Sequence, residues 1–384
     1  MHIVLGAYLL SGTPGYRQAG IHQYIKHLLY SLADSQSQPD WRFTALVSPT
    51  ALAEGPVRLA LQPARCSTEH PLVRVIVEQL DTPHLLRQLG ADLYHGLGFA
   101  VPLRAPCPTV VTVFDLSFIT HPQAHRRFSR WYLARFTRWS CWRAARVIAI
   151  SEWTKRELVR HFGLPAERID VTPLGVDHDH FRPPPAEQVA AFRARHGIGE
   201  ASIFYLGSLE PRKNLPRLIE AFARLCAGHP DLPATLFIGG SPAWKYEPIV
   251  ARVRALGLDE RVRLIGRVSA EELPLWYAAC AVMAYPSLYE GFGLPPLEAM
   301  ACGTPVVASN AAALPEVIGD AGLLVAPTDV TGLADALWRV LSDPDLRAGL
   351  QAKGLARATR FTWARTAALT LESYRRALAS LPSR

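Results

Sequence analysis

Short apolar runs alternate with longer helical stretches along almost the whole chain. The runs are rich in Val, Ile, Leu and aromatic residues, and most end in Gly, Ser, Asp or Pro. This alternation predicts the repeated strand and helix units of a parallel α/β fold. The expected strands of the first half are residues 3–8, 43–47, 92–95, 109–114 and 146–150. Those of the second half are residues 203–206, 235–238, 262–264, 281–284, 305–308 and 322–325.

A triple proline, Pro183–Pro185, separates the two sets of strands. Such runs form stiff linkers, and 384 residues are enough for two domains. We therefore expect two doubly wound, Rossmann-like domains at 1–182 and 183–364, with 365–384 as a C-terminal helix packing towards the first domain. Because open α/β sheets bind ligands at the carboxyl ends of their strands, the two domains should face each other across a ligand-binding cleft.

Composition restricts the compartment and the partners. The six cysteines are far apart and form no C-x-x-C pair, which favours a reducing cytosol over a disulfide or zinc framework. No apolar run approaches the ~18 residues of a membrane-spanning helix. The first run, residues 3–10, lacks a preceding Lys or Arg and a small-residue cleavage site, so we interpret it as a buried strand.

A glycine-rich loop, residues 12–15, follows the first expected strand, and Gly20 then opens a helix. Free backbone N–H groups at a helix N-terminus can bind phosphate. Gly15 and Gly20 have P-loop spacing, but Ile21 and His22 stand where that motif has Lys and Ser or Thr. The sequence therefore disfavours a P-loop NTPase and leaves phosphate binding and an ordinary strand-to-helix turn both open.

A second strand-to-helix turn, residues 207–214, carries adjacent cations at Arg212 and Lys213. Two positive charges beside backbone N–H donors suit a diphosphate. The alternative is a solvated turn with no ligand.

The segment 285–300 has the features of a ligand-facing loop that leads into a helix. Gly291 and Gly293 let backbone approach a ligand, and the Pro295–Pro296 pair sets a helix start, with Glu298 expected in the first turn. The Gly291-x-Gly293 pattern is no dinucleotide fingerprint, because Pro296 replaces the third glycine.

Seven residues separate Glu290 from Glu298, and this E-x7-E pair resembles the signature of the family-four retaining glycosyltransferases (glycosyl transferases group 1). The resemblance covers nearly the whole chain and includes the first glycine-rich loop and residues 147–153, 173–177, 207–214, 290–298 and 303–309. It implies the GT-B fold, a mannosyltransferase-like activity with retention of anomeric configuration, donor binding to the C-terminal domain and acceptor binding to the N-terminal domain.

The resemblance also implies residue roles. Arg212 and Lys213 match the diphosphate contacts, Glu298 the carboxylate that holds the ribose, and Glu290 the one that faces the donor sugar. The other matching positions are Phe292, Gly293 and Leu294 beside the sugar, Gly20 near the phosphates, and Arg267 and Val268 along the base. Ser208 departs from relatives that have Arg at this point, which shifts diphosphate recognition onto Arg212 and Lys213.

A second departure affects the acceptor side. Many relatives have His-Asp-Leu at the end of the fourth strand, whereas this chain has Phe114-Asp115-Leu116. Asp115 remains at the expected cleft. His95 could orient an acceptor hydroxyl, and His121 is a weaker candidate, but each histidine could equally be structural.

The run Asp177-His178-Asp179-His180 suggests a metal site, and D-x-D is a manganese motif of the other large glycosyltransferase fold. Ligands at consecutive i, i+2 positions do not form a closed site, and the segment matches the family's interdomain connection. We therefore expect no metal and no cofactor beyond the nucleotide-sugar substrate.

Most of the net charge of +8 is local: residues 126–146 hold seven Arg and no acidic residue. On a helix, six interleaved aromatic residues fall within an arc of about 140°. Such a helix can lie on an anionic membrane, or it can pack its aromatic face on the sheet. Nucleic acid binding is disfavoured, because no recognised module accompanies the patch.

Together these features predict a retaining, metal-independent glycosyltransferase that moves a hexose from a nucleotide-diphosphate sugar, with GDP-mannose and UDP-glucose as first choices. The acceptor would be a glycan or lipid-linked molecule in lipid-linked or cell-surface glycan synthesis, and the location cytoplasmic or peripheral on the plasma membrane. Alternatives are a retaining glycosidase, which gives no reason for the Arg212–Lys213 loop, and a catalytically silent nucleotide-sugar or glycan-binding protein.

Overall fold

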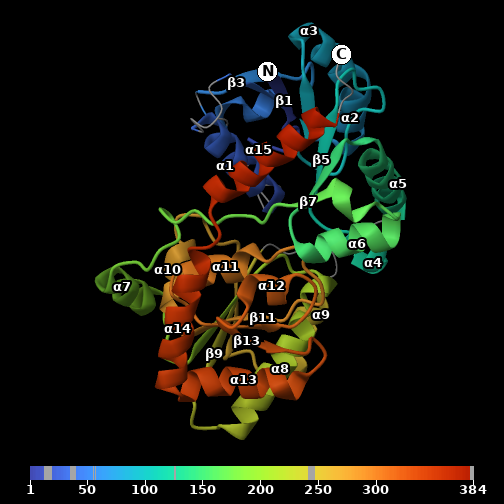
Figure 1. Cartoon of the computed structure of the whole chain (residues 1–384). Coiled ribbons are helices and arrows are strands. Elements are labelled where there is room, and N and C mark those ends of the chain that lie inside the picture. Colours follow the sequence, from blue (N-terminus) through green and yellow to red (C-terminus); the bar gives the residue numbers. More distant parts are fainter. Residues whose placement is uncertain are drawn as a thin grey trace. The chain divides into compact units, whose positions relative to one another are not determined.

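The computed structural model describes residues 1–12, 20–34, 40–54, 56, 58–124, 127–240 and 247–380 (Figure 1). Contacts divide the chain into two compact units: unit 1 is Met1–Gly175 with Trp363–Arg384, and unit 2 is Val176–Thr362. By these contacts the units meet after Gly175 and after Thr362, and Val176 and Thr362, the first and last residues of unit 2, pair in an isolated β-bridge. The triple proline lies within unit 2, where it leads into the helix Ala186–His196.

In its described residues, unit 1 contains a sheet of seven parallel strands in the order β3-β2-β1-β4-β5-β6-β7. The strands are β1 (His2–Gly6), β2 (Arg42–Val47), β3 (Ala60–Pro63), β4 (Leu93–Gly96), β5 (Thr109–Val113), β6 (Arg146–Ala149) and β7 (Ile169–Val171). β3 and β7 are absent from the expected set. β3 is a partly exposed edge strand that ends in proline, and β7 has three residues, so neither has a clear apolar pattern.

The helices of unit 1 include one from the far end of the chain. They are α1 (Gly20–Ala33), α2 (Pro71–Ile76), α3 (Thr82–Leu89), α4 (Ser117–Thr120), α5 (Arg127–Arg143), α6 (Glu152–Phe162) and α15 (Trp363–Ala379). Shorter turns are η2 (Pro49–Glu54), the π-helical η3 (Val77–Asp81), η4 (Pro122–Ala124) and η5 (Ala166–Arg168). α15 packs on α1 and on strands β5 and β6, which makes it part of this unit.

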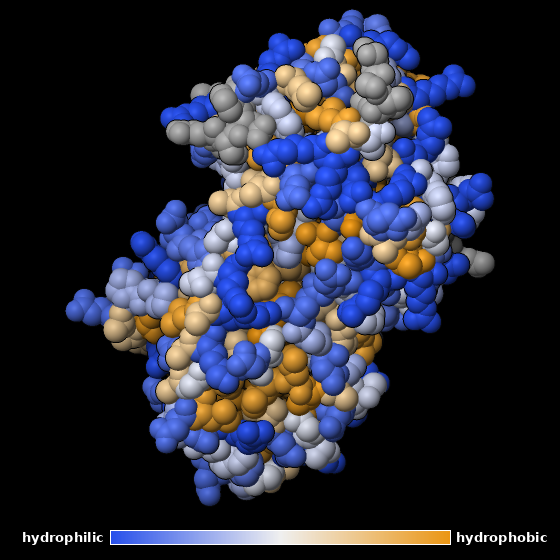
Figure 2. All heavy atoms as spheres, in the orientation of Figure 1, coloured by the Kyte–Doolittle hydropathy of each residue, from blue (hydrophilic) through white to orange (hydrophobic). Residues whose placement is uncertain are grey.

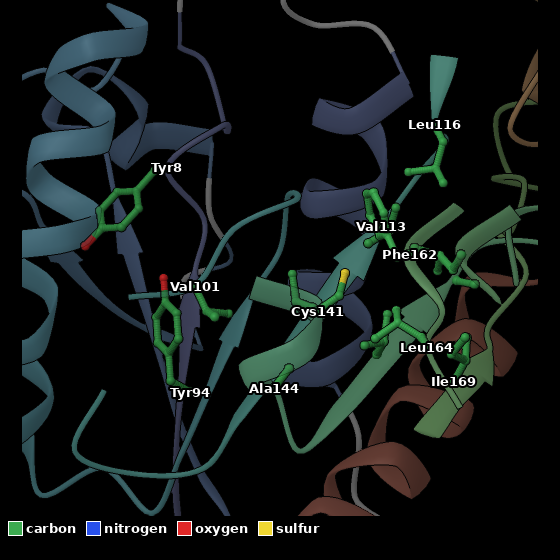
Figure 3. Packing of buried hydrophobic residues seen from close by; sticks show 14 of the residues in the cluster. Tyr8, Tyr94, Val101, Val113, Leu116, Cys141, Ala144, Phe162, Leu164 and Ile169 are labelled. Carbon is green, nitrogen blue, oxygen red and sulfur yellow. The ribbon is translucent and has the colours of Figure 1, made fainter. Parts of the chain in front are cut away.

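A buried apolar cluster joins the sheet of unit 1 to its helices. It includes Val113 of β5, Cys141 of α5, Ala144 just after α5, and Phe162 of α6 (Figure 3). These side chains are almost fully buried, and burial of this kind supplies the main stabilising free energy of a fold. The cluster fixes the inner face of α5 against the sheet.

Unit 2 contains, among the described residues, six parallel strands in the order β10-β9-β8-β11-β12-β13. They are β8 (Ser202–Leu206), β9 (Thr235–Gly239), β10 (Val262–Gly266), β11 (Val282–Tyr285), β12 (Val306–Ser309) and β13 (Gly322–Val325). The helices are α7 (Ala186–His196), η6 (Pro211–Lys213), α8 (Leu215–Gly228), α9 (Glu247–Ala255), α10 (Leu273–Ala279), α11 (Leu294–Ala301), α12 (Leu314–Ile318), α13 (Val330–Ser342) and α14 (Pro344–Ala358).

Each sheet has a point at which the strand order reverses. In unit 1 it lies between β1 and β4, and in unit 2 between β8 and β11. Ligands of doubly wound sheets bind at the carboxyl ends of the strands beside this switch point. The loops that follow β8 and β11 are therefore the first place to look for a site in unit 2.

Candidate active site

The loops after β8 and β11 are joined by direct hydrogen bonds. The backbone N–H of Leu288 donates to the carbonyl of Arg212 over 2.9 Å. The side-chain amide of Asn214 donates to the carbonyls of Pro286 over 2.9 Å and Pro327 over 2.7 Å. Asn214 has a left-handed backbone (φ 62°), which ends η6 and begins α8 in one residue. This connection brings two segments more than 70 residues apart to one edge of the sheet.

Close backbone packing explains the glycines at this edge. A Cβ atom at Gly240 would lie 1.8 Å from the carbonyl oxygen of Gly207, and one at Gly207 would lie 2.6 Å from the hydroxyl of Tyr205. Any larger residue would force these loops apart. The glycines therefore keep the turn after β8 close to the end of β9.

Glu290 lies at the centre of a buried ionic network on these loops. The Lys213 ammonium donates to Glu290 Oε1 over 2.7 Å, and the Arg212 guanidinium donates to Oε2 over 3.1 Å. Arg212 also donates to the carbonyl of Tyr289 over 2.6 Å and to Glu210 over 2.8 Å. The structure thus brings together all three residues predicted for the chemistry.

The charges of the network determine its pKa values. Burial alone would raise the pKa of Glu290, but the Lys213 and Arg212 cations outweigh it and hold this pKa at about 2. Burial lowers the pKa of Lys213, while the Glu290 carboxylate opposes that effect. At neutral pH the network therefore has a carboxylate held between cations, a suitable arrangement for binding hydroxyl groups and phosphate oxygens.

Two stacked tyrosines support Lys213 from within the sheet. Lys213 donates to the hydroxyl of Tyr285 over 3.1 Å, and the rings of Tyr285 and Tyr205 stack with centroids 6.2 Å apart. Sequence reasoning did not single out Tyr285, Tyr205 or Glu210. Tyr285 is the last residue of β11 beside the predicted loop, so the strand end itself was the available signal.

The second carboxylate, Glu298, is on α11. Tyr277 donates to Glu298 over 2.8 Å, and burial raises the pKa of Glu298 to about 7. The expected position in the first turn is wrong: α11 begins at Leu294, so Glu298 is its fifth residue. The reason is Gly293, whose left-handed backbone (φ 114°) caps the helix one residue earlier than the proline pair suggested.

The remaining donor-side positions also follow strand ends of unit 2. Phe292 is buried against Phe361, and the chain enters α11 at Leu294. Ser208 is exposed in the turn after β8. Arg267 and Val268 follow β10, and a Cβ at Gly239 would lie 3.1 Å from Val268 Cγ2. All of these residues therefore follow the carboxyl ends of strands of one sheet.

In unit 1 the sequence-predicted residues have mixed environments. Gly20 is the first residue of α1, while residues 13–19 of the preceding loop lie outside the described residues. Asp115 is half-buried and accepts from the backbone N–H of Ser117 over 2.8 Å. Phe114, where the resemblance leads us to expect a histidine, packs edge-on against Tyr24 with ring centroids 5.1 Å apart.

A histidine that contacts an acceptor needs a ring nitrogen that the acceptor can reach, and His95 does not have one. It is fully buried, its Nδ1 lies 2.6 Å from the hydroxyl of Tyr374, and its Nε2 lies 2.8 Å from that of Thr112. Burial lowers its pKa to about 3. Because both ring nitrogens have protein partners, neither is available to an acceptor hydroxyl, and we leave His95 out of the proposed acceptor contacts.

The Asp177–His180 run is a turn whose side chains have separate partners. Asp177 accepts from the backbone N–H groups of Asp179 and His180 over 3.1 and 3.3 Å. His178 Nε2 is 3.3 Å from the carbonyl of Phe361, and His180 Nε2 is 2.9 Å from that of Ala270. Within the described ranges, no group of three or more His, Cys, Asp or Glu residues is placed to hold a metal ion.

The basic aromatic segment forms α5, and Arg126 lies outside the described residues. Tyr132, Phe136 and Trp139 are half-buried, so much of the aromatic face packs on the protein. Trp131 and Trp142 are exposed, and Trp142 donates to the carbonyl of Phe162 over 3.0 Å. No helix in the described part of the chain is long and apolar enough to cross a membrane.

Comparisons with known proteins agree with this geometry. Residues 189–357 match the family model described as Glycosyl transferases group 1, and residues 20–180 match the one described as Glycosyltransferase Family 4. The chain is 34% identical over 290 residues to O-antigen chain mannosyltransferase B from Escherichia coli, which covers 76% of each protein. It is 36% identical over 247 residues to D-inositol 3-phosphate glycosyltransferase from Pseudarthrobacter chlorophenolicus, covering 61% of this chain and 56% of that one.

Solved structures share the architecture over nearly the full length. Sucrose-phosphate synthase from Thermosynechococcus elongatus superposes with a TM-score of 0.79 at 24% identity, covering 99% of this chain and 100% of that one. HepE from Anabaena in complex with UDP-glucose gives 0.75 at 20% identity, covering 98% and 99%. Two Rossmann-like units of this kind form the GT-B fold. The chain belongs to the family-four, group 1 glycosyltransferases.

Proposed function

We propose that this chain is a retaining, metal-independent hexosyltransferase that uses a nucleotide-diphosphate sugar. The observation that carries the proposal is the buried contact of Glu290 with both Lys213 and Arg212 at the switch point of unit 2. A lone structural ion pair needs one cation, whereas a leaving diphosphate needs two or more positive groups beside it.

The proposed roles follow from the charges. Arg212 and Lys213 stabilise the nucleoside diphosphate as it leaves, Glu290 holds hydroxyls of the donor sugar, and Glu298 accepts from the ribose. Ser208, Arg267 and Val268 contact the nucleotide. We assign no general base, since the leaving phosphate can itself take the proton of the acceptor. Two cations at the diphosphate loop supply the positive charge that a metal gives other transferases, which supports metal independence.

We propose a mannosyl donor first and a glucosyl donor second, with a lipid-linked or cell-surface glycan as acceptor near Asp115. The support is the name of the relative that matches three quarters of the chain, an O-antigen chain mannosyltransferase. The UDP-glucose bound to a structural neighbour supports the second donor.

One observation favours a second candidate, a silent nucleotide-sugar or glycan-binding protein. Phe114 replaces a histidine that many relatives place near the reacting centre, and its ring is buried against Tyr24. A binding protein of the same fold would keep the donor contacts and lack turnover.

Ligand panels separate these functions. The purified protein is heated with GDP, UDP, ADP and their sugars, and the matching nucleotide at 100 times its dissociation constant should add ~2.7 kcal/mol to stability. Release of that nucleoside diphosphate is then measured with candidate acceptors, with and without a metal chelator. Binding without release from any donor would favour the silent protein. Loss of activity with the chelator would contradict metal independence.

We also propose that α5 contacts an anionic membrane on the cytoplasmic face. Arg130, Arg135 and Arg138 are exposed, and the sequence of α5 contains no acidic residue. Changing Arg130 and Arg138 to Glu should abolish flotation with anionic vesicles at low salt, and unchanged flotation would exclude the contact.

A further inference from the structure

Three exposed apolar side chains stand in a row on α2 and η3. Leu72, Ile76 and Leu80 are separated by four residues each, and they are 54%, 56% and 70% exposed. In the view of Figure 2 most of the surface is hydrophilic, with apolar residues in scattered patches. A regular row of large aliphatic side chains in water marks a binding surface more often than chance exposure does.

The π-helical turn keeps the row straight. Four residues advance an α-helix by about one turn plus 40°, so Ile76 is displaced to one side of Leu72. In η3 each turn holds more residues, so the step from Ile76 to Leu80 rotates less and brings Leu80 back into line. The change of helix type therefore aligns the three side chains on one outer edge.

Polar contacts on the inner face hold this turn in place. Thr82 donates to the carbonyl of Val77 over 3.0 Å, and its hydroxyl is 2.8 Å from that of Tyr8. Gln79 donates to the carbonyl of Val101 over 3.2 Å and accepts from the backbone N–H of Leu103 over 2.8 Å. Val77 belongs to the buried core cluster. The outer row thus stands on a fixed support.

Two further exposed apolar side chains lie on elements next to this row. Leu103 is 40% exposed and Trp131 of α5 is 59% exposed. Val101, next to that loop, donates to Ser140 of α5 over 3.1 Å, and α2 and α5 lie on the same side of unit 1 (Figure 1).

Five of the eleven exposed large apolar residues in the described part of the chain therefore belong to this surface, which we call the apolar edge. They are Leu72, Ile76, Leu80, Leu103 and Trp131.

The charge around the apolar edge is positive. The Arg135 guanidinium lies 5.3 Å from the centre of the Trp131 ring, and Arg130 and Arg138 are exposed on the same helix. Glu78 is buried, with Arg74 Nε 3.9 Å from its carboxylate. Asp81 is half-buried, so α2 and η3 present little negative charge to solvent.

We propose that the apolar edge inserts into the interface of an anionic lipid bilayer. Leu72, Ile76 and Leu80 enter the boundary between headgroups and acyl chains, while the arginines of α5 contact the anionic headgroups. This inference rests on the proposed membrane contact of α5 and adds its apolar half. The side chains that enter the bilayer are those of α2 and η3, because most of the described aromatic face of α5 is packed on the protein.

Vesicle binding at low and high salt distinguishes the contribution of the α5 arginines from that of the inserted apolar side chains. Flotation is measured with phosphatidylglycerol vesicles and with phosphatidylcholine vesicles at ~0.1 M and ~0.5 M salt, since screening weakens the arginine contacts and leaves insertion. The triple variant Leu72→Gln, Ile76→Gln, Leu80→Gln should lower the high-salt partition coefficient for anionic vesicles by about 100-fold. Leu52→Gln and Leu264→Gln are matched controls, because these leucines are 42% and 43% exposed and lie outside the apolar edge.

Each outcome has one meaning. Loss of binding in the triple variant, with both controls like wild type, supports insertion. A triple variant that floats like wild type overturns it, even where Arg130→Glu and Arg138→Glu abolish low-salt binding and so uphold the proposed charge contact. Wild-type protein that floats with no anionic vesicle overturns both. A wild-type dimer that the triple variant converts to a monomer in sedimentation assigns the edge to a second copy and overturns the lipid proposal.

If the triple variant does not fold, the single variant Leu80→Gln still tests the proposal. This side chain is the most exposed of the three, so its replacement leaves the core unchanged. We expect about a fivefold loss of high-salt binding at an unchanged melting temperature. Binding equal to wild type would count against insertion.

Discussion

Among the described residues, a connected group of buried polar side chains can be compared between the two units, and the two groups differ in charge. In unit 2, Glu290 is bonded to Lys213 and Arg212 as an ionic network. In unit 1, Tyr24, Thr112, His95 and Tyr374 form a neutral chain, with oxygen and nitrogen atoms 2.6 to 2.9 Å apart. Both groups connect elements distant in sequence, but only the ionic network lies on loops at a sheet edge.

The difference separates a binding role from a packing role. Buried ions lose hydration that an apolar replacement would not lose, so an ionic network is weak support for stability. A neutral chain with every hydrogen bond made costs little and fixes the packing of α1 and α15 on the sheet. We therefore expect the ionic network to control activity and the neutral chain to control stability.

The largest expected effect is on transfer by Glu290→Gln. The amide keeps the size of the side chain but loses the negative charge that we propose for the donor sugar, so turnover should fall by at least about 1000-fold. Product release with the natural donor measures it, and Glu260→Gln at an exposed position is the control. Turnover within tenfold of wild type would contradict the role of Glu290.

The next effect is on nucleotide binding and stability by Lys213→Met. Loss of a charged contact should weaken nucleoside diphosphate binding by about 30-fold. Glu290 then keeps Arg212 as its only cation, and its buried Oε1 loses its partner, so the free energy of unfolding should fall by about 3 kcal/mol. Calorimetry and denaturant unfolding measure these changes. In the double variant with Glu290→Gln the stability losses should be far from additive, because the two side chains share one contact. Additive losses would show that the network is not a unit.

How far the sequence predicts each network depends on where its residues stand. The ionic residues follow β8 and β11 in short motifs with clear spacing, so the parallel topology was enough to bring them together. The neutral chain draws on residues from 24 to 374 with no local pattern, and the sequence pointed to His95 for a different role. Only the packing of α15 on β5 and β6 shows that His95 has a tyrosine partner.

Surface assignments were predicted less well for a similar reason. The apolar arc of residues 126–146 was visible in the sequence, but a periodic pattern does not say which face a neighbouring element covers. The row on α2 and η3 has the i, i+4, i+8 spacing of one helix face, but the π turn at Val77–Asp81 changes the number of residues per turn. Its alignment therefore could not be read from spacing.

Lowering the pH from 6.5 to 5 should change the free energy of unfolding by about 2 kcal/mol through the neutral chain and hardly at all through the ionic network. His95 has a pKa of about 3 in the folded state against 6.5 for an ordinary histidine, so the unfolded chain binds the extra proton as pH falls below 6.5. Wild type should lose about 2 kcal/mol from this group between pH 6.5 and 5. Glu290, with a pKa of about 2 against 4.5, contributes stability that falls only below pH 4.5.

The comparison variant for this titration is His95→Gln. Other groups also titrate in this range, so we compare the difference in free energy of unfolding between wild type and variant. This difference should become smaller by about 2 kcal/mol from pH 6.5 to 5. The gap between wild type and Glu290→Gln should stay constant over the same range. A gap for His95→Gln that does not change with pH would show that this histidine is not held neutral.

The smallest expected effect compares two hydroxyl deletions of the same kind. Tyr374→Phe removes the partner of His95, and Tyr285→Phe removes a partner of Lys213. Each should cost about 1 kcal/mol of stability, since each leaves one buried polar atom with a lost contact. Only Tyr285→Phe should also weaken nucleoside diphosphate binding, by about threefold, because Lys213 then loses one of the acceptors that orient its ammonium. Tyr205→Phe is the control, since its hydroxyl donates to the carbonyl of Ser208 over 3.4 Å and not to Lys213. A neutral chain that serves packing has no charge with which to bind the donor. Equal losses of nucleoside diphosphate binding in Tyr374→Phe and Tyr285→Phe would therefore contradict the distinction between the networks.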